Sequence, residues 1–334
     1  MISALVLLAI GPTTWFVSPG RSGDDSNEGT SLDKPLKSVS KAVEKAGDKD
    51  VIKLLDGIYP EQKLEIADRD LTIESIGNAN PRLKSLEISV KDGKLTVSDL
   101  EIQGEAKLSG VEKSELAGKQ MRFLGPVDMS GFRYAGFTES RFNRAGVSAS
   151  AIGDPKVGKK PPVVLTFARC ISVDAPGDAF QVRDIRGVIE WQNCLVVRSK
   201  AKAISVRNAP RATVDFCTIA DVGDFALAVV KCPLTVTNSI IRALPGKIRN
   251  GGSIASDYNL FAGDPPEADR FGTHDQFGDP KFGLALAGGD LQIYRPLSTS
   301  PALKAASPRD RLAVDLTGSP RTRPADLGCL QVSR

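Results

Sequence analysis

Four short fragments in the second half of the sequence align without gaps, and this repeat limits the fold more than any other feature. They read LTFARCISV (165–173), IEWQNCLVV (189–197), ATVDFCTIA (212–220) and LTVTNSIIR (234–242). The aligned residues Cys170, Cys194, Cys217 and Ser239 are 24, 23 and 22 residues apart. A repeat of this length, built from short apolar runs, indicates a solenoid in which each repeat packs on its neighbours.

The apolar runs have the length and the alternation of β-strands. A second column recurs half a period later, with alanine and valine at the same spacing: Ala179 and Val182, Ala203 and Val206, Ala226 and Val229. Further copies lie at 71–76, 95–100, near Ser140 and at 256–261. Alternating strand-length runs exclude helix pairs, and the leucine frame of leucine-rich repeats is absent. The sequence therefore predicts a parallel β-helix.

Stacked coils place equivalent residues in line, which explains the cysteine column. We expect Cys170, Cys194 and Cys217 to be small interior side chains and favour free thiols, although neighbouring coils would also allow a disulfide. Asn193, Asn238 and Asn259 are expected one residue before this column, in left-handed turns that asparagine tolerates. Without a Cys-x-x-Cys pair, a zinc site is not expected.

The stretch before the first coil predicts a cap for the open end of the solenoid. Residues 36–47 place Leu36, Val39, Ala42, Val43 and Ala46 on one helical face, and Gly47 ends the helix. The preceding loop, DDSNEG (24–29), resembles a calcium loop only superficially, because Pro35 stands where a bidentate glutamate is required. We expect this loop to turn the chain and cap the helix.

The N-terminus and the overall charge bound the compartment and the partners. Residues 2–10 form an apolar run too short to span a bilayer, which predicts a cleaved signal peptide over 1–14; a buried first strand or a wrongly assigned start is the alternative. Lys and Arg (44) nearly balance Asp and Glu (40) with no basic block, so nucleic acid is not an expected partner. We expect the chain to consist of a signal peptide (1–14), an N-terminal cap (15–50), the parallel β-helix coils (51–262) and a C-terminal tail (263–334) that packs on the β-helix.

Motifs at both ends carry a resemblance to a known family. FVSPGRSGDDSNEGTSLDKPLKSVSKAV (16–43), VIKLLDGIYPE (51–61) and the tail segments 278–283, 289–306 and 315–328 resemble right-handed parallel β-helix proteins of the pectate-lyase type, especially secreted bacterial members. The resemblance implies an all-β, right-handed parallel β-helix with an N-terminal helix cap and an irregular tail. It also implies an extracytoplasmic location. It does not imply one activity, since the group includes lyases, hydrolases, epimerases and members without catalysis.

Sites in this group usually lie outside one sheet, so we searched for outward charged columns. The densest set spans three coils near residues 174–224. Its predicted members are catalytic Lys202, Arg207 and Arg198, substrate-binding Arg183 and Lys200, and Asp178, Asp221 and Asp174 as calcium ligands. A lyase needs a base and cations for the substrate carboxylate, whereas a hydrolase needs two carboxylates. Alternating Asp and Arg on stacked coils also fits a solvated surface ladder.

Two other features are weaker candidates for a site. His274 is the only histidine, and its position beyond the last clear coil favours a loop or cap role. The loop DPKVGKKPP (154–162) is basic and beside the coils, where either contact with an acidic polymer or a plain solvent loop is open.

The sequence thus predicts an exported, monomeric protein that binds an acidic polysaccharide or cleaves it by β-elimination, with Ca²⁺ as the one cofactor considered. The alternative is a non-catalytic cell-surface or envelope scaffold, whose rod offers a long binding face. No integral membrane segment is expected in the mature chain.

Overall fold

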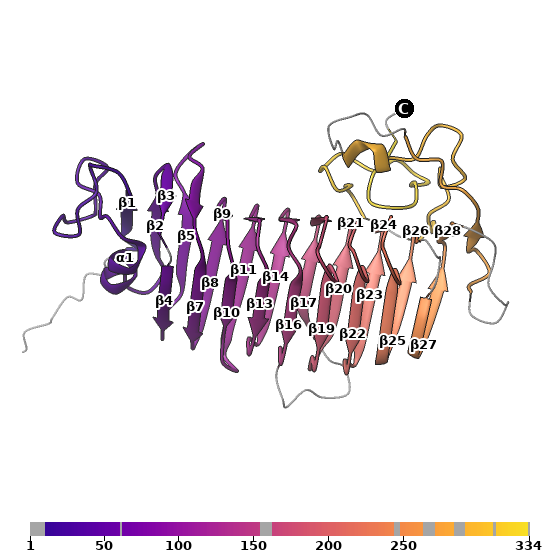
Figure 1. Cartoon of the computed structure of the whole chain (residues 1–334), viewed down its shortest axis with the longest axis horizontal. Coiled ribbons are helices and arrows are strands. Elements are labelled where there is room, and N and C mark those ends of the chain that lie inside the picture. The colour runs from indigo at the N-terminus through magenta and orange to yellow at the C-terminus, as the bar shows by residue number, and fades with distance from the viewer. Residues whose placement is uncertain are drawn as a thin grey trace, which may run out of the picture.

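The computed structural model describes residues 11–60, 62–153, 162–243, 248–262, 271–283, 291–309 and 312–332. Strands stack in parallel along one axis, with a short helix at one end and an irregular tail at the other (Figure 1). The predicted all-β parallel β-helix is thereby confirmed. The apolar run 2–10 and most of the basic loop 154–162 lie outside the described residues, whereas Thr14 already belongs to the first strand.

Each coil passes through three parallel ladders. Buried and exposed residues alternate along the strands, as in β4 (Gln62–Ala67), and the buried set fills the interior. The first ladder consists of β1 (Thr14–Val17), β2 (Asp50–Leu54), β5 (Leu71–Ser75), β8 (Gly93–Ser98), β11 (Ser114–Lys119), β14 (Tyr134–Thr138), β17 (Val163–Ala168), β20 (Val188–Gln192), β23 (Arg211–Asp215) and the second halves of β25 (Leu227–Thr237) and β27 (Ile248–Asp257).

The second ladder has shorter strands and lies along the upper edge in Figure 1. It consists of β3 (Gly57–Tyr59), β6 (Pro81–Leu83), β9 (Glu101–Ile102), β12 (Arg122–Phe123), β15 (Arg141–Asn143), β18 (Ile171–Val173), β21 (Leu195–Val197), β24 (Thr218–Ala220), β26 (Ile240–Arg242), β28 (Leu260–Phe261) and β29 (Gln276–Phe277).

The third ladder returns the chain to the next coil. It consists of β4 (Gln62–Ala67), β7 (Leu86–Lys91), β10 (Ala106–Ser109), β13 (Val127–Ser130), β16 (Val147–Ser150), β19 (Phe180–Arg183), β22 (Ile204–Arg207) and the first halves of β25 and β27. The tail adds one 3₁₀ turn, η1 (Leu291–Tyr294).

The register follows the predicted repeat. Cys170, Cys194 and Cys217 are fully buried free thiols on one interior line, as expected. The residues that directly follow these cysteines keep the same register, because Leu195 pairs with Ile171 on one neighbouring strand and with Thr218 on the other.

The corner before this column is left-handed, and only two of the three predicted asparagines occupy it. Asn193 and Asn238 both have φ of 53°. The prediction for Asn259 is wrong by one residue, because Tyr258 takes the corner with φ of 56°. Asn259 instead stands in the buried column, where its amide donates to Val236 O (2.8 Å) and accepts from Ser239 N (2.9 Å). The polar side chain is tolerated inside because both ends of its amide are hydrogen-bonded.

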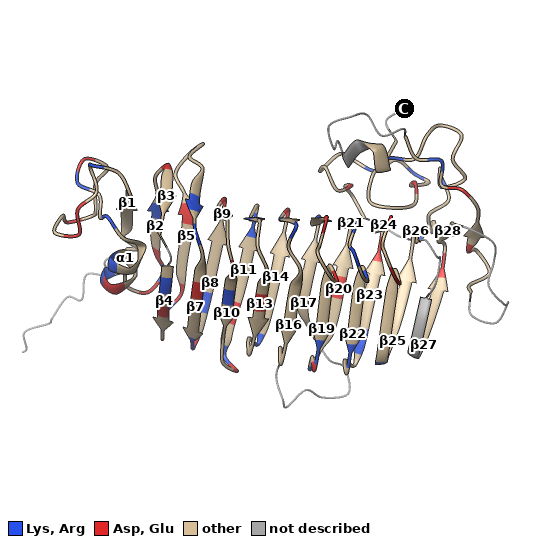
Figure 2. Cartoon of the chain, viewed as in Figure 1, with Lys and Arg blue, Asp and Glu red and all other residues tan. Residues whose placement is uncertain are grey.

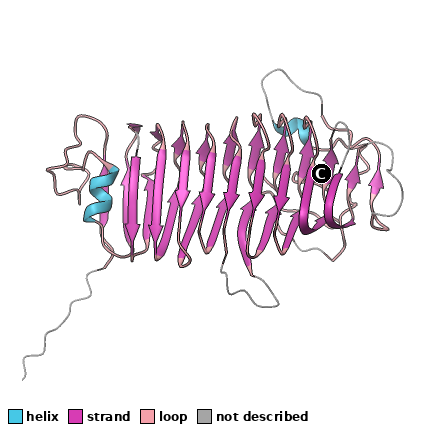
Figure 3. Ribbon diagram, turned by 60° about the horizontal axis from the view of Figure 1, so that its bottom comes forward, coloured by secondary structure: helices cyan, strands magenta, loops and turns pink. Residues whose placement is uncertain are grey.

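Helix α1 (Val39–Lys45) closes the N-terminal end, lying across the first coils (Figure 3). The apolar face predicted for it is buried, from Leu36 to Ala46. Ser38 is the N-cap, accepting from Lys41 N at 3.2 Å, and Asp25 Oδ1 accepts from the backbone N–H of Ser38 at 2.9 Å. The acidic loop therefore serves the cap, as predicted. No helix in the described part of the chain is long and apolar enough to cross a membrane.

Candidate functional site

The outer face of the second ladder changes its chemistry along the rod. Parallel pairing places one outward residue from each strand in a single column, and Figure 2 shows charged residues along these coils. In order, this column reads Arg82, Glu101, Arg122, Arg141, Ile171, Leu195, Thr218 and Ile240. The change from charged to mainly apolar residues falls between Arg141 on β15 and Ile171 on β18.

The C-terminal tail covers the apolar part of this face, as Figure 1 shows above β21 and β24. We call its described residues within 291–332 the roof. The buried cluster beneath it joins roof and ladder residues: Tyr294, Leu316, Cys329 and Leu330 from the roof, and Val173, Leu195, Val197 and Ala220 from the ladder. Burial of these side chains holds the roof on the solenoid.

Arg321 ties the roof to the corner asparagine. Its Nη2 donates to Asn193 Oδ1 at 2.7 Å and to Gly328 O at 2.8 Å. The guanidinium carbon lies 4.2 Å from the centre of the Phe216 ring. Burial lowers the pKa of Arg321.

The uncovered part of the ladder carries a groove. Three hollows of about 300, 540 and 460 Å³ follow one another, and each shares lining residues with the next. Arg122 joins the first to the second, and Arg141 and Asn143 join the second to the third. Between β6 and β21, at about 4.8 Å per strand, the groove is roughly 24 Å long. We call this feature the arginine groove, after Arg122, Arg141, Arg144 and Arg198 in its lining.

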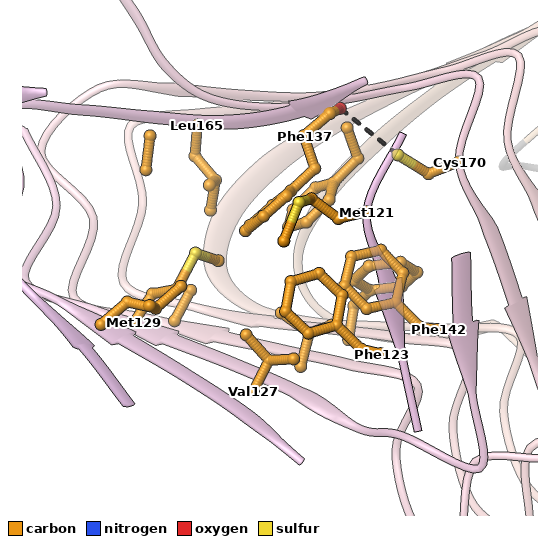
Figure 4. Close-up of a cluster of buried hydrophobic side chains, with 14 of the residues drawn as sticks. Met121, Phe123, Val127, Met129, Phe137, Phe142, Leu165 and Cys170 are labelled. Carbon is orange, nitrogen blue, oxygen red and sulfur yellow. Dashed lines mark hydrogen bonds between the residues drawn. The ribbon is translucent and has the colours of Figure 1, made fainter. Parts of the chain in front are cut away.

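The floor of the arginine groove is supported by stacked aromatic rings. Phe123 and Phe142 follow Arg122 and Arg141 on the same strands and point inward, because successive residues of a strand face opposite sides. Their ring centres are 5.2 Å apart with nearly parallel planes (Figure 4). In each Arg-Phe pair, the buried phenylalanine packs in the core and so holds in place the strand from which the arginine points outward.

Arg141, like the more exposed Arg144, has no carboxylate ion-pair partner among the described residues, whereas Arg122 and Arg198 each have one. Arg122 pairs with Glu101 at 3.1 Å, and Arg198 holds Asp174 through two bonds of 2.7 and 3.1 Å. Arg141 Nε donates to Asn143 Oδ1 at 3.1 Å. Burial, followed by the charge of Arg122, lowers the pKa of Arg141.

A hydrogen-bonded network stands where the groove meets the roof. The Tyr294 hydroxyl donates to Asp221 Oδ2 at 2.9 Å and lies close enough to Arg198 for each group to affect the pKa of the other. Arg242 completes it through an ion pair with Asp221. Hydrogen bonding to Asp174 raises the pKa of Arg198, and Arg198 in turn lowers the pKa of Asp174. Burial, together with Asp221, raises the pKa of the Tyr294 hydroxyl.

Three of the residues predicted from sequence meet in this network. Asp174, Arg198 and Asp221 occupy one left-handed corner, with φ of 56°, 55° and 55°. Their equal spacing from the cysteine column reflects this shared corner.

Lys202 and Asp178 lie in a second cluster, in the turns before β22 and β19. The Lys202 ammonium lies 3.6 Å from Asp178 and 3.8 Å from Asp224, one on each neighbouring coil. The backbone N–H of Lys202 also donates to Asp178 at 3.0 Å. No ion pair within the described residues joins this cluster to the arginine groove.

Arg183 and Arg207 form a third group, facing each other at the ends of β19 and β22, where both are exposed. At about 3.3 Å per residue, the five residue steps from Lys202 to Arg207 on β22 separate the two by roughly 16 Å. Lys200 is exposed in the turn before β22. The structure thus distributes the predicted residues over three places.

The carboxylates predicted as calcium ligands do not fit a calcium site in this arrangement. Arg198 holds Asp174, Arg242 and Tyr294 hold Asp221, and Lys202 holds Asp178. Across the described ranges, no three acidic, histidine or cysteine side chains gather as metal ligands. Calcium prefers several oxygen ligands around one point.

His274 lies near the last strand pair, where its ring stacks on Tyr258 at 4.2 Å and its Nδ1 lies 3.0 Å from Asp257 Oδ1. These contacts join the end of β27 to the turn before β29. They agree with the loop or cap role expected for this residue.

Sequence reasoning missed four residues that line the groove, Arg122, Arg141, Asn143 and Arg144, and it also missed the buried Tyr294 of the roof. A signal was present in the repeated Arg-Phe pairs at 122–123 and 141–142, where later coils have an apolar outward residue. Tyr294 gave no signal, because its position depends on how the irregular roof folds back.

The sequence matches no family model and no curated protein. Among solved structures, pectate lyase Pel9A aligns with 97% of this chain and 98% of its own, at 13% identity and a TM-score of 0.58. A rhamnogalacturonan lyase aligns at 12% identity over 80% and 87%, with a TM-score of 0.40. A GH136 lacto-N-biosidase from Eubacterium ramulus aligns at 12% over 80% and 68%, with a TM-score of 0.38. The likeness to Pel9A shows that the fold is a pectate-lyase-type β-helix, which confirms the predicted resemblance.

Proposed function

We propose that the protein binds an acidic polysaccharide along the arginine groove and cleaves it by β-elimination. The observation that carries this proposal is Arg141, a half-buried cation without a carboxylate partner in the described chain, fixed in the middle of the groove. A structural ion-pair ladder would have supplied an acid there, as Glu101 does for Arg122.

The groove suits a linear anionic polymer. Its length exceeds that of a single sugar, and Arg122, Arg144 and Arg198 flank Arg141 along it. A guanidinium binds a carboxylate through two parallel hydrogen bonds, which suits uronic acid residues. The neighbouring Asn143 adds an amide for sugar hydroxyls.

The proposed reaction starts at the carbon next to the uronate carboxylate. A base removes its proton, the C–O bond to the glycosidic oxygen at the next carbon breaks, and a C=C bond forms between the two carbons. The departing oxygen takes a proton from solvent, so the products are a new chain end and an unsaturated sugar.

We assign the base to Arg141. The assignment rests on position, because Arg141 lies in the middle of the groove and has no ion-pair partner among the described residues. Burial lowers the pKa of its guanidinium, which is the direction that this role requires. The remaining arginines would neutralise the substrate carboxylate and the negative charge that develops on it. Calcium enters no step of this scheme.

The test is incubation with a panel of uronic acid polymers, with and without Ca²⁺, following the ultraviolet absorbance of new unsaturated ends. The Arg141→Ala variant should lose about 10²-fold or more in rate. Arg211→Ala, which removes an exposed arginine at the start of β23, should retain the wild-type rate. Full activity of the Arg141 variant would refute the assignment.

Two further variants test the positions predicted from sequence. Loss of activity in Lys202→Ala or Arg207→Ala, with Arg141→Ala unaffected, would move the reaction to the third ladder. Binding of acidic polymers without any new unsaturated ends would instead support the scaffold function.

Export is part of the proposal, resting on the apolar run at residues 2–10. Expression of the full chain with its leader in a bacterial host, followed by N-terminal sequencing of the exported form, tests it. Retention of the intact leader in the cytoplasm would contradict it.

A further inference from the structure

The arginine groove ends against the roof, and this has a consequence for how a polymer can enter it. Val173 lines the last hollow and also packs in the buried cluster with Tyr294. The next strand, β21, is already covered, because Leu195 and Val197 are buried in the same cluster. The column that forms the groove floor therefore continues beneath the roof, where it is closed to ligands.

The closed end is built from fixed side chains rather than from a loose loop. Tyr294 is 2% exposed and packs edge-to-face on Phe282 at 5.7 Å. The Arg242 guanidinium carbon also lies over the Phe282 ring, 5.2 Å from its centre. Arg242 forms an ion pair with Asp221 as well. We call the group Asp174, Arg198, Asp221, Tyr294 and Arg242 the end wall.

The end wall presents polar groups toward the groove. The side chains of Arg198 and Asp174 are 35% and 46% exposed, and both line the last hollow together with Arg141 and Arg144. Three guanidinium groups and one carboxylate thus surround the position next to the wall. The guanidinium groups can bind a sugar carboxylate, and Asp174 can accept hydrogen bonds from free hydroxyls.

The opposite end of the groove has another character. Its first hollow, next to β6 and β9, is lined by neutral polar residues such as Asn78, Asn80 and Gln120, with Asp99 and the Glu101–Arg122 pair. In the described chain, the roof contacts the coils from β18 onward and leaves this end uncovered (Figure 1). Along the axis of the rod, a bound chain can therefore extend past β6 but not past β21.

We propose that the acidic polysaccharide binds end-on, with one chain terminus against the end wall at Arg198 and Asp174 and the rest extending toward β6. This inference rests on the proposed function. The protein would then recognise chain ends. Cleavage at Arg141 would release short products from one terminus instead of cutting within the chain.

Binding of polygalacturonate and its oligomers of defined length, compared at equal mass of uronic acid, tests the inference directly. End-on binding predicts that the apparent affinity per mass rises with the number of ends, about tenfold for chains ten times shorter. A bulky fluorophore attached at one terminus should weaken binding at least tenfold when that terminus is the one that meets the wall. Affinity that follows total mass, with tags at neither terminus having an effect, would overturn the inference.

The outcome is separable from that of the proposed function. Absence of binding to every acidic chain would refute the proposed function and this inference together, whereas mass-dependent binding would refute the inference alone. Arg198→Ala should weaken oligomer binding by about tenfold or more, as expected for losing a hydrogen bond to a charged group. Arg211→Ala is the matched control, and Tyr294→Phe, which keeps the roof packing, should show a smaller loss.

Discussion

Replacing Arg321 with alanine tests whether the roof is held on the solenoid as described. The change removes hydrogen bonds to Asn193 Oδ1 (2.7 Å), Gly328 O (2.8 Å) and Asp326 O (3.2 Å) and the contact with the Phe216 ring. Bonds to a charged donor contribute about 1.5–3 kcal/mol each, and the cation–π contact adds about 1 kcal/mol. The cost of burying the guanidinium offsets part of this sum, so we expect a net loss of about 3 kcal/mol.

Hydrogen exchange measures this loss locally. The amides of Gly328, which donates to Asn238 O, and of Leu316, which donates to Cys329 O, should exchange about 100-fold faster in the variant. Amides of β5 to β14, far from the roof, should be unchanged. Arg309→Ala, an exposed arginine in the same tail, is the control. Exchange in the roof that rises less than fivefold, or that rises equally throughout the coils, would refute the reasoning.

Three further predictions concern stability and the thiols. Burial by itself raises the pKa of Asp50, but hydrogen bonds from Trp15, Gly47 and Thr13 outweigh it, so the pKa is lowered overall. The stability that the ionised Asp50 contributes to the fold is therefore present above about pH 4 and is lost as the pH falls through the lowered pKa. Asp50→Asn should therefore cost about 1–3 kcal/mol in urea unfolding at pH 7 and much less at pH 2; an equal cost at both would be inconsistent with the pairing. Phe142→Ala should cost about 3–5 kcal/mol by the same assay, and a loss below 1 kcal/mol would contradict the stacking beneath Arg141. A thiol reagent should label none of the buried cysteines in the native protein and all of them after denaturation, namely Cys170, Cys194, Cys217, Cys232 and Cys329. Rapid labelling of the native protein would contradict their burial.

Much of the fold was predictable because a solenoid is a local repeat. The spacing of Cys170, Cys194 and Cys217 gives the register of the coils, since each coil contacts its sequence neighbours. The cap was also readable, because an amphipathic face and a serine N-cap are properties of one short segment. The error at Asn259 shows the limit: the last coil is shorter, so the alignment slipped by one residue.

The candidate site was less predictable for a physical reason. Charges on neighbouring coils were correctly expected to stack, yet stacking alone does not show which face stays open. Asp174, Arg198 and Lys202 look equivalent in the sequence, but the first two meet the roof and the third is held between two carboxylates.

By itself, the sequence determined the parallel β-helix, its register, its capped end and the buried thiol column, because these depend on periodic contacts between neighbouring repeats. Only the tertiary structure decided where a ligand could bind, because the roof returns from residues 291–332 to cover strands more than 100 residues earlier, such as β18. That long-range packing leaves Arg141 uncovered, places Tyr294 near Arg198, and gives the groove on the second ladder one closed end.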